Sequence, residues 1–368
     1  MKILLLSDYE SDFLADGLVA GLYGIAGEQD LTIAEVPIIR HRHGLIDQNY
    51  TLADGKQGFT GPTTDLVRNA PPLPSMTEEE ALERWGEFDL ILMTSLRAYS
   101  RDALRKLCRV SGKKPGELPL AVADGDDHDF IDFPYLEELR PKVFFKRELL
   151  RKAERFSPYA WGHDIPIWPL QFAAHYTNLP SLPEEKFVDI FCSLGRTHPT
   201  RDLLISAILA AIPKINCSHY IAYSPPEGVD DPYALLKGRQ DWDGYMKLLA
   251  GARLSVSVRG YGRDVLHYWE GFMAGTTMMV VDPGIIIPHP FMPHDHYIPI
   301  EPPYEDIAGK MKLYLNKPQW LEEKRLAAKE HCLRFHTTEK RAEFLIKIAQ
   351  GYLYDAQPPS PEEFGLWT

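Results

Sequence analysis

Short, uninterrupted apolar runs alternate along the chain with segments of helical periodicity. Residues 2–7 (KILLLS) form such a run, and the apolar residues between 13 and 25 recur every three or four positions. Continuous apolar runs are typical of parallel strands buried on both faces, and the longer spacing is typical of amphipathic helices. The same reading predicts strands at 31–36, 89–94, 118–123 and 142–145 and helices at 77–85 and 102–110. We therefore predict an α/β domain with a parallel sheet in the first half of the chain.

A second series of strands and helices follows a proline-rich stretch. Prolines recur between residues 158 and 183 at a density that suppresses regular structure, so we interpret this stretch as an interdomain linker. Apolar strands and amphipathic helices resume at residue 187 and continue to residue 354. We expect one Rossmann-like domain at 1–170, a second at 171–335, and a C-terminal helix and tail at 336–368 that can cross back to the first domain.

The most informative stretch is residues 259–275, RGYGRDVLHYWEGFMAG, between the apolar runs 252–258 and 276–281. Strand, glycine-bearing turn, helix and strand are the succession of a βαβ unit. One side of the predicted helix is apolar and carries Val265, Leu266, Trp269, Phe272 and Met273. The other side is polar and carries Arg263, His267 and Glu270.

The start of this segment favours an anion. Gly260 and Gly262, with Tyr261 between them, allow close approach of the backbone, and a helix N-terminus attracts negative charge. Two arginines flank the same point, Arg259 and Arg263. Glu270 follows about 10 Å further along the axis, which suits a diphosphate at the helix start and ribose hydroxyls at the carboxylate. The alternative is an ordinary crossover helix with a solvated charged side.

The segment resembles the donor-binding motif of GT-B glycosyltransferases, above all the spore-maturation CgeB-type and glycosyl transferases group 1 families, and more distantly the exostosin family. The matching residues are Ser255, Arg259, Gly260, Gly262, Asp264, Trp269, Glu270 and Gly275. The resemblance implies an α/β GT-B fold, with two Rossmann-like domains facing a cleft. It also implies that the acceptor binds the N-terminal domain and the donor the C-terminal one, where Glu270 holds the nucleotide ribose and the arginines meet the diphosphate.

Two positions depart from the family pattern. His267, a candidate donor-binding residue, stands where the family usually has an arginine, and it adds to the positive charge near the phosphate only when its imidazole is protonated. Gly262 stands where the E-x7-E pattern has its first glutamate. The missing glutamate favours an inverting over a retaining reaction.

A second basic turn follows the predicted strand at 187–195. It contains Arg196, and Arg201 lies at the start of the next predicted helix. GT-B enzymes place a basic contact to the donor diphosphate at such a turn, so both arginines are candidate donor ligands. The alternative is that both are surface charges at a helix start.

An acidic cluster, DGDDHD at residues 124–129, follows the predicted strand at 118–123. Open α/β sheets bind ligands at the carboxyl ends of their strands. Direct displacement at the anomeric carbon needs a base beside the acceptor hydroxyl, and our candidate is Asp126 or His128, with Asp8, Asp12 and His43 as rivals. The cluster could instead bind Mg²⁺ or Mn²⁺ through its carboxylates. We predict that no metal is needed, because the arginines can supply positive charge to the leaving diphosphate.

The composition of the chain argues against a nucleic-acid-binding surface and against a membrane span. The net charge of −12 over 368 residues opposes a nucleic-acid surface, because duplex binding depends on phosphate neutralisation. No run reaches the roughly 18 apolar residues of a membrane span, and the apolar N-terminal run is too short for a signal peptide. The four cysteines show no metal-ligand spacing and fit buried thiols in a reducing compartment. We expect a cytoplasmic protein.

These features favour a nucleotide-sugar-dependent glycosyltransferase. Its donor would be UDP- or GDP-linked, and no further cofactor is expected. The sequence does not identify the acceptor, which could be a glycan, a small molecule or a protein. A nucleotide-sugar epimerase can share this fold. A sugar-nucleotide-binding protein without catalytic activity is a third interpretation, which the departure at His267 keeps open.

Overall fold

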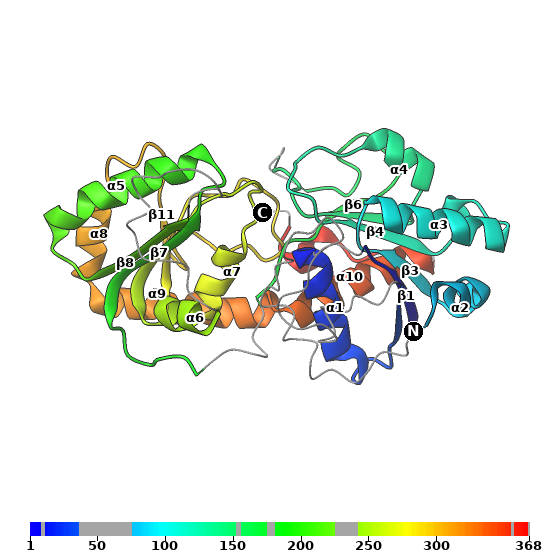
Figure 1. The fold of residues 1–368 in the computed structure, drawn as a ribbon, viewed down its shortest axis with the longest axis horizontal. Coiled ribbons are helices and arrows are strands. Elements are labelled where there is room, and N and C mark those ends of the chain that lie inside the picture. Colours follow the sequence, from blue (N-terminus) through cyan, green and yellow to red (C-terminus); the bar gives the residue numbers. More distant parts are fainter. Residues whose placement is uncertain are drawn as a thin grey trace. The chain divides into compact units, whose positions relative to one another are not determined.

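The computed structural model describes residues 1–8, 12–36, 76–151, 156–174, 181–224, 242–354 and 357–366 (Figure 1). Contacts divide the chain into two compact units. The first comprises Met1–His175, Ile286–His289 and Thr337–Thr368, and the second comprises Tyr176–Ile285 and Pro290–His336. Among the described residues, no helix is long and apolar enough to cross a membrane.

The first unit is built on a parallel six-stranded sheet with the order β2-β1-β3-β4-β5-β6. The strands are β1 (Lys2–Leu6), β2 (Thr32–Val36), β3 (Leu90–Met93), β4 (Leu120–Asp124), β5 (Val143–Lys146) and β6 (Ile167–Pro169). The five strands expected from apolar runs are present, with bounds that differ by a residue or two. Because the chain passes from β1 to β2 and then continues on the other side of β1, the strand order reverses between β1 and β3.

Helices surround this sheet, and their bounds follow local signals. They are α1 (Phe13–Ala26), α2 (Glu78–Glu83), α3 (Ala98–Ser111), α4 (Phe133–Leu139) and α10 (Thr338–Leu353), with short 3-10 turns η2 (Trp85–Glu87), η3 (Pro115–Glu117) and η4 (Pro361–Phe364). Thr77 caps α2: its hydroxyl accepts from Glu80 N, while the Glu80 carboxylate accepts in return from Thr77 N.

Strand β6 lies inside the stretch that the sequence analysis interprets as a linker. It pairs in parallel with β5, Phe144 opposite Ile167, and Phe144 N donates to Pro166 O at 2.9 Å. Prolines are tolerated here because β6 is the edge strand, whose outer side needs no donors. The prediction that proline density excludes regular structure is therefore wrong for residues 167–169.

The second unit has a parallel five-stranded sheet with the order β11-β10-β9-β7-β8. Its strands are β7 (Val188–Gly195), β8 (His219–Ser224), β9 (Ala252–Ser257), β10 (Thr277–Val280) and β11 (Ile298–Pro299). Its helices are α5 (Pro199–Ile215), α6 (Trp242–Ala250), α7 (Leu266–Met273), α8 (Ile307–Leu315) and α9 (Pro318–Phe335). Its buried core includes Ile190, Leu204, Leu254, Met279 and Met311. Strand order reverses between β7 and β9, as it does between β1 and β3 in the first sheet.

The C-terminal helix α10 packs against α1 within the first unit. Gly21 marks the closest approach, because a Cβ placed there would lie only 2.0 Å from the carbonyl oxygen of Thr338. Further along the tail, Phe344 and Phe364 meet the ring of buried Trp168 edge-on. The end of the chain thus supplies part of the first unit's core.

The glycine in α1 yields a stability prediction. Gly21→Ala should lower the free energy of unfolding by about 1–3 kcal/mol, the usual range for overpacking, although alanine is the better helix former. Gly24→Ala is the matched control, since its nearest neighbour is the flexible side chain of Glu339. There the gain in helix propensity should raise stability by up to about 1 kcal/mol. Urea unfolding measures both, and equal stabilities would show that close packing does not require glycine at position 21.

Candidate functional site

The donor-side motif occupies the turn between β9 and α7. Gly260 N donates to Gly262 O at 2.9 Å, so the backbone closes on itself there. Both glycines are buried, whereas the side chain of Tyr261 between them is 67% exposed. The guanidinium of Arg259 donates to Tyr261 O at 3.1 Å. Its Nε is buried and has no hydrogen-bond partner among the described residues.

Helix α7 begins at Leu266, one turn later than the polar stripe in the sequence indicates. His267 and Glu270 do lie on the helix, and each is about nine-tenths buried. Arg263 instead belongs to the preceding turn, where its Nη1 donates to Pro283 O at 3.3 Å. The glycines therefore lie in the loop that precedes the helix. Our prediction that they lie at the start of the helix is wrong.

Arg201 is buried and connects two turns of this unit. Its Nη1 donates to Gly195 O at 2.8 Å, its Nε to Arg259 O at 3.0 Å and its Nη2 to Val258 O at 3.3 Å. A Cβ on Gly260 would lie 2.9 Å from Nη2, so the guanidinium occupies the space that a side chain would need. The close approach that this glycine permits in the structure is thus to Arg201.

The turn after β7 carries more positive charge. Helix α5 is capped by His198, whose Nδ1 accepts from Thr200 N at 3.2 Å. Burial lowers the pKa of His198, and the charges of Arg259, Arg201 and Arg263 lower it further. Three guanidinium groups are therefore close enough to this helix N-terminus to act on one imidazole. Arg196, from the same turn, pairs with Asp202 at 3.1 Å.

A chain of hydrogen bonds ends at the carboxylate of Glu270. Tyr245 of α6 donates from its hydroxyl to Glu270 Oε2 at 2.5 Å, and its oxygen lies 2.6 Å from His267 Nδ1. His267 Nε2 in turn lies 3.2 Å from Ser255 Oγ. The imidazole of His267 therefore lies between two hydroxyl groups, and the Tyr245 hydroxyl links it to the Glu270 carboxylate.

Burial sets the ionisation of this chain. It raises the pKa of Glu270 to about 7, although the hydrogen bond from Tyr245 opposes the shift. It lowers the pKa of His267 to about 4, and the nearby charge of Arg201 adds to that effect. His267 is therefore neutral at pH 7 and adds no positive charge, contrary to the possibility that it assists the arginines when protonated. Among these hydrogen-bonded side chains, Glu270 is the group whose pKa lies near neutrality.

Asp264 and Trp269, two residues of the family motif, bind each other and so hold the turn in place. The indole Nε1 of buried Trp269 donates to Asp264 Oδ1 at 2.7 Å. The indole also contacts the rings of Tyr268 and His336. These two motif positions fix the turn against the helix.

The acidic cluster of the first unit surrounds a buried ammonium. Lys146, at the end of β5 and fully buried, donates to Asp124 Oδ2 at 2.7 Å and lies 3.2 Å from His128 Nδ1. His128 Nε2 lies 3.4 Å from Asp126 Oδ2, so the imidazole bridges the ammonium and this carboxylate. The structure therefore brings the two predicted base candidates together. Asp127 pairs with the buried guanidinium of Arg147.

The rival bases occupy other positions. Asp12 caps α1, with its Oδ1 accepting from Leu14 N and Ala15 N at 2.9 and 3.1 Å, and burial raises its pKa. This structural role accounts for its position. Asp8 directly follows β1, and its Oδ2 is buried without a partner among the described residues. His43 lies outside the described residues.

Asp124, Asp126 and His128 bring ligand atoms close enough to hold a metal ion. Lys146 competes for that place, because its ammonium already binds Asp124 Oδ2 and touches His128 Nδ1. The other oxygen of Asp124 accepts from Asp126 N at 3.0 Å. A divalent ion would have to displace a buried positive charge, so the residues present fit an internal ion pair better than a metal site.

Two residues of the donor side, Tyr245 and Thr197, are not predicted from the sequence. Tyr245 lies at helical spacing with Trp242, Met246 and Leu249, which marks it as a core residue and not as a partner of Glu270. Thr197 adjoins the Gly260 turn, and its Oγ1 is buried with no partner in the described part of the chain. No local sequence pattern predicts the contact of Tyr245 with Glu270 or that of Thr197 with the Gly260 turn, because each joins residues far apart in sequence.

Comparison with solved structures identifies the fold. A glycosyltransferase from Rickettsia africae ESF-5 superimposes with a TM-score of 0.59 at 12% identity, over 96% of this chain and 98% of the other. Anabaena HepE, in a complex with UDP, gives 0.58 at 12% identity over 94% and 98%. The chain has the GT-B fold.

A third GT-B relative in structure is the sucrose-phosphate synthase of Thermosynechococcus elongatus, with a TM-score of 0.52 at 12% identity over 97% of this chain and 100% of the other. The predicted α/β architecture of two Rossmann-like domains is thus confirmed. No protein-family model matches the sequence, and no curated protein matches it either. The finer resemblance to CgeB-type and exostosin families stays a prediction.

Arg201 yields a prediction within this site. Arg201→Lys keeps the charge but cannot reach three carbonyl oxygens, so the free energy of unfolding should fall by about 1–3 kcal/mol. Arg196→Lys is the control, because its pair with Asp202 is partly exposed and should contribute less than about 1 kcal/mol. Urea unfolding of the full chain compares the two variants. If they lose equal stability, Arg201 does not connect the two turns.

Proposed function

We propose that the protein is a glycosyltransferase that moves a sugar from a nucleotide-sugar donor to an acceptor. The observation that carries the proposal is the arrangement around α7 of a GT-B fold. A buried carboxylate, Glu270, lies on the helix, and Arg259 and Arg263 lie in the turn that precedes it. The carboxylate suits a ribose diol, and the arginines suit a diphosphate.

The donor contacts follow from the atoms that lack partners. Glu270 Oε2 accepts from Tyr245, whereas Oε1 accepts from none of the described residues, so it is the oxygen offered to the ribose hydroxyls. Arg259 Nε and Thr197 Oγ1 are likewise unpartnered in the described part. Arg259, Arg263 and Arg196 would meet the diphosphate. Arg201 would position the two turns, since three of its donors already bind carbonyls.

The donor is UDP- or GDP-linked in this proposal, and UDP-sugars are the first to test because Anabaena HepE was solved with UDP. The backbone amides of the turn and the N-terminus of α5 would add to the field of the arginines. This field would stabilise the charge that develops on the leaving diphosphate, so turnover should need no divalent metal. The ion pair of Lys146 and Asp124 in the first unit supports the same view.

The acceptor binds the first unit in this proposal, and an acidic side chain there removes the proton of its hydroxyl. Of the two candidates, Asp126 fits the role better than His128. The imidazole uses one nitrogen toward Lys146 and the other toward Asp126, whereas Asp126 Oδ1 has no partner among the described residues. A base on the acceptor side implies direct displacement, and therefore inversion at the anomeric carbon.

The proposal is tested by turnover with purified protein. UDP-, GDP-, ADP- and CDP-sugars are screened by thermal shift, where a donor at a hundredfold excess over Kd stabilises by about 2.7 kcal/mol. The donor that binds is then assayed with an acceptor library in excess EDTA and with added Mg²⁺ or Mn²⁺. We expect sugar transfer, or slow donor hydrolysis, at the same rate with and without metal, and an inverted linkage by NMR.

Other outcomes each remove one part of this proposal. Loss of turnover in EDTA, restored by metal and abolished by Asp124→Asn, would replace the arginine mechanism by a metal site. A changed donor sugar without any acceptor would indicate an epimerase. Tight nucleotide binding with neither transfer nor hydrolysis would indicate a binding protein without catalysis.

The ionisation of Glu270 predicts a pH dependence of donor binding. Its carboxylate accepts from ribose, and its pKa is about 7, so affinity should rise by about tenfold between pH 6 and pH 8. Glu270→Gln should weaken binding and abolish the dependence. Tyr245→Phe removes a hydrogen bond that favours the carboxylate, so the midpoint should move to higher pH. The measurement is calorimetric Kd for the intact nucleotide sugar at each pH.

The control for this experiment is the free protein. The pKa of Glu270 is raised above its ordinary value of 4.5, so folding binds a proton, and the free energy of unfolding contributed by this group falls as pH rises from 4.5 to 7. Glu270→Gln should flatten that slope as well. A donor affinity that keeps its pH dependence in Glu270→Gln would assign the titration to another group.

A further inference from the structure

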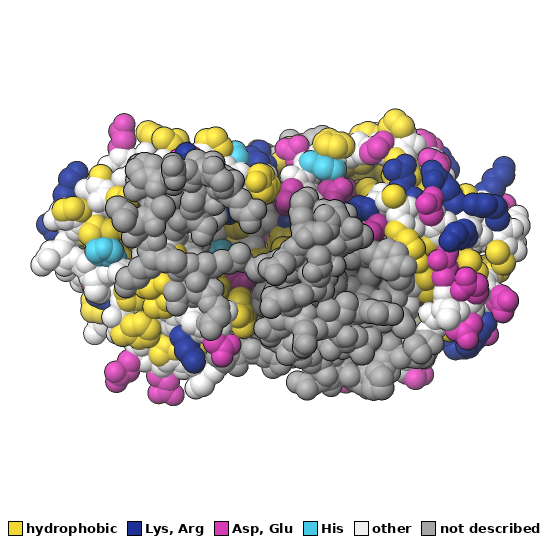
Figure 2. All heavy atoms as spheres, in the orientation of Figure 1, with side chains coloured by type: hydrophobic (Ala, Val, Ile, Leu, Met, Phe, Trp, Pro, Cys, Tyr) yellow, Lys and Arg dark blue, Asp and Glu magenta, His cyan; other side chains and the backbone are white. Residues whose placement is uncertain are grey.

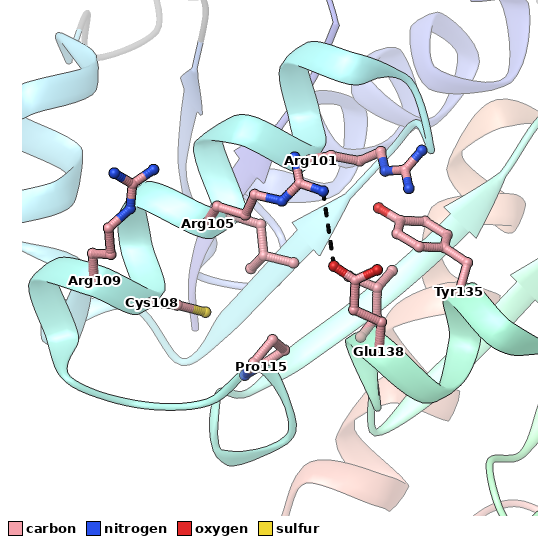
Figure 3. Close-up of a pocket in the computed structure, with 9 residues that line it drawn as sticks. Arg101, Arg105, Cys108, Arg109, Pro115, Tyr135 and Glu138 are labelled. Atoms are coloured by element: carbon pink, nitrogen blue, oxygen red, sulfur yellow. Dashed lines mark ion pairs between the residues drawn. The ribbon is translucent and has the colours of Figure 1, made fainter.

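A separate cavity lies on the flank of the first sheet, between α3, η3 and α4 (Figure 3). Its volume is about 380 Å³, within the range of small-molecule sites of roughly 300–1,000 Å³. Leu104, Leu139, Pro115 and Cys108 contribute apolar surface to its lining. None of the residues that line it belongs to the acidic cluster or to the donor-side turn.

Three arginines follow one another along the α3 side of this cavity. Arg101, Arg105 and Arg109 are spaced at i, i+4 and i+8, so they share one face of the helix. Arg105 donates from Nη1 to Asp102 Oδ1 at 3.0 Å on its own helix, and its Nη2 lies 3.8 Å from Glu138 across the cavity, as the dashed line in Figure 3 marks. Arg109 makes no ion pair or hydrogen bond with any described residue. The cavity thus offers guanidinium donors in excess of its carboxylates.

A buried hydroxyl adds a second polar feature. Tyr135 is only 7% exposed, and its Oη has no hydrogen-bond partner in the described chain. Arg101 lies over the same ring, with Cζ 3.9 Å from the centroid, and its Nε is also buried without a partner. Burial raises the pKa of Tyr135 to about 12, so the hydroxyl keeps its proton and can donate. Buried donors without acceptors are uncommon and destabilising unless a ligand satisfies them.

The surrounding surface is basic although the protein is acidic. Residues 97–117 include seven lysines and arginines and two acidic residues, in a chain of net charge −12. Lysine and arginine side chains gather over α3 in the space-filling view (Figure 2). This local field favours an anion at the cavity and raises its rate of encounter.

We propose that this cavity binds an organic phosphate, with the phosphate held by Arg105 and Arg109, the Tyr135 hydroxyl as a further donor, and an apolar tail lying on Leu104 and Leu139. Guanidinium groups bind phosphate oxygens in pairs, and several guanidinium groups around one site match three phosphate oxygens better than a single carboxylate. The apolar lining distinguishes the ligand from inorganic phosphate. The phosphate could belong to a small soluble ester or to a lipid headgroup, which present the same chemistry.

Glu138 has a defined part in this proposal. Its carboxylate is the acidic group of the cavity lining, and it is held by Arg105 at a distance longer than an ordinary hydrogen bond. An incoming phosphate would take over Arg105 and leave Glu138 to solvent. Removing the charge of Glu138 should therefore strengthen binding, a response that a merely structural pair would not give.

The test uses the full chain and defined probes. Hexyl phosphate, inorganic phosphate and hexanol are titrated by calorimetry, and vesicles of phosphatidylcholine with and without phosphatidic acid are tested by co-sedimentation. Cys108 reports on occupancy, because its thiol lines the cavity and its reaction with N-ethylmaleimide can be read by peptide mass spectrometry. We expect hexyl phosphate to bind more tightly than either fragment and to protect Cys108.

Variants separate the site from general charge effects. Arg105→Gln and Arg109→Gln should each weaken hexyl phosphate binding about tenfold, and Tyr135→Phe a few-fold, while Glu138→Gln should tighten it. Lys106→Gln is the matched control: it removes the same charge from the same helix at a residue that does not line the cavity and instead pairs with Glu78. It should change binding less than twofold.

Each outcome decides the proposal. Binding only to phosphatidic acid vesicles, with the same response to Arg105→Gln and Glu138→Gln, would assign the phosphate to a lipid surface. Hexyl phosphate binding that is unaffected by the arginine variants, or equal loss in Lys106→Gln, would overturn the site. Absence of binding by any phosphate probe would overturn it as well. None of these results depends on donor binding or on sugar transfer.

Discussion

The donor-side site depends on one buried guanidinium. Arg201 belongs to α5, yet its three hydrogen bonds end on carbonyls at the end of β7 and just after β9. These two strands are neighbours where the strand order of the sheet reverses, the place where open α/β sheets bind ligands. Because the guanidinium also fills the space above Gly260, helix, glycine and both turns are fixed together. The more exposed Arg259 is oriented by this arrangement.

The strands and most helices could be predicted because burial on both faces leaves an apolar run that local sequence shows directly. The two errors have physical reasons. Strand β6 consists of three residues at a sheet edge, where prolines are permitted and no alternation can develop. The start of α7 was placed a turn too early, because Arg263 has helical spacing to His267 by sequence alone. Periodicity cannot distinguish a loop residue from a first helical turn.

The sequence predicts the contacts of the site only where the residues belong to the same helix or turn. Glu270 and His267 lie together because they share a helix, and the sequence shows that directly. Tyr245 reaches them from the neighbouring helix α6, and its apolar neighbours mark it as a core residue. In the same way a lysine at the end of β5 gives no sign that it is buried between Asp124 and His128. Pairings of this kind are set by topology and not by spacing.

The departure at His267 changes the chemistry of the donor side. A histidine can donate from one nitrogen and accept at the other, whereas an arginine offers only donors. In this chain the imidazole lies between two hydroxyl groups, with Nε2 3.2 Å from Ser255 Oγ and Nδ1 2.6 Å from the Tyr245 oxygen. Since burial keeps the imidazole neutral, this position contributes no charge toward a phosphate. His267 instead binds the Tyr245 hydroxyl, which donates to Glu270. The positive charge of the site therefore comes from the arginines of the two turns that Arg201 connects.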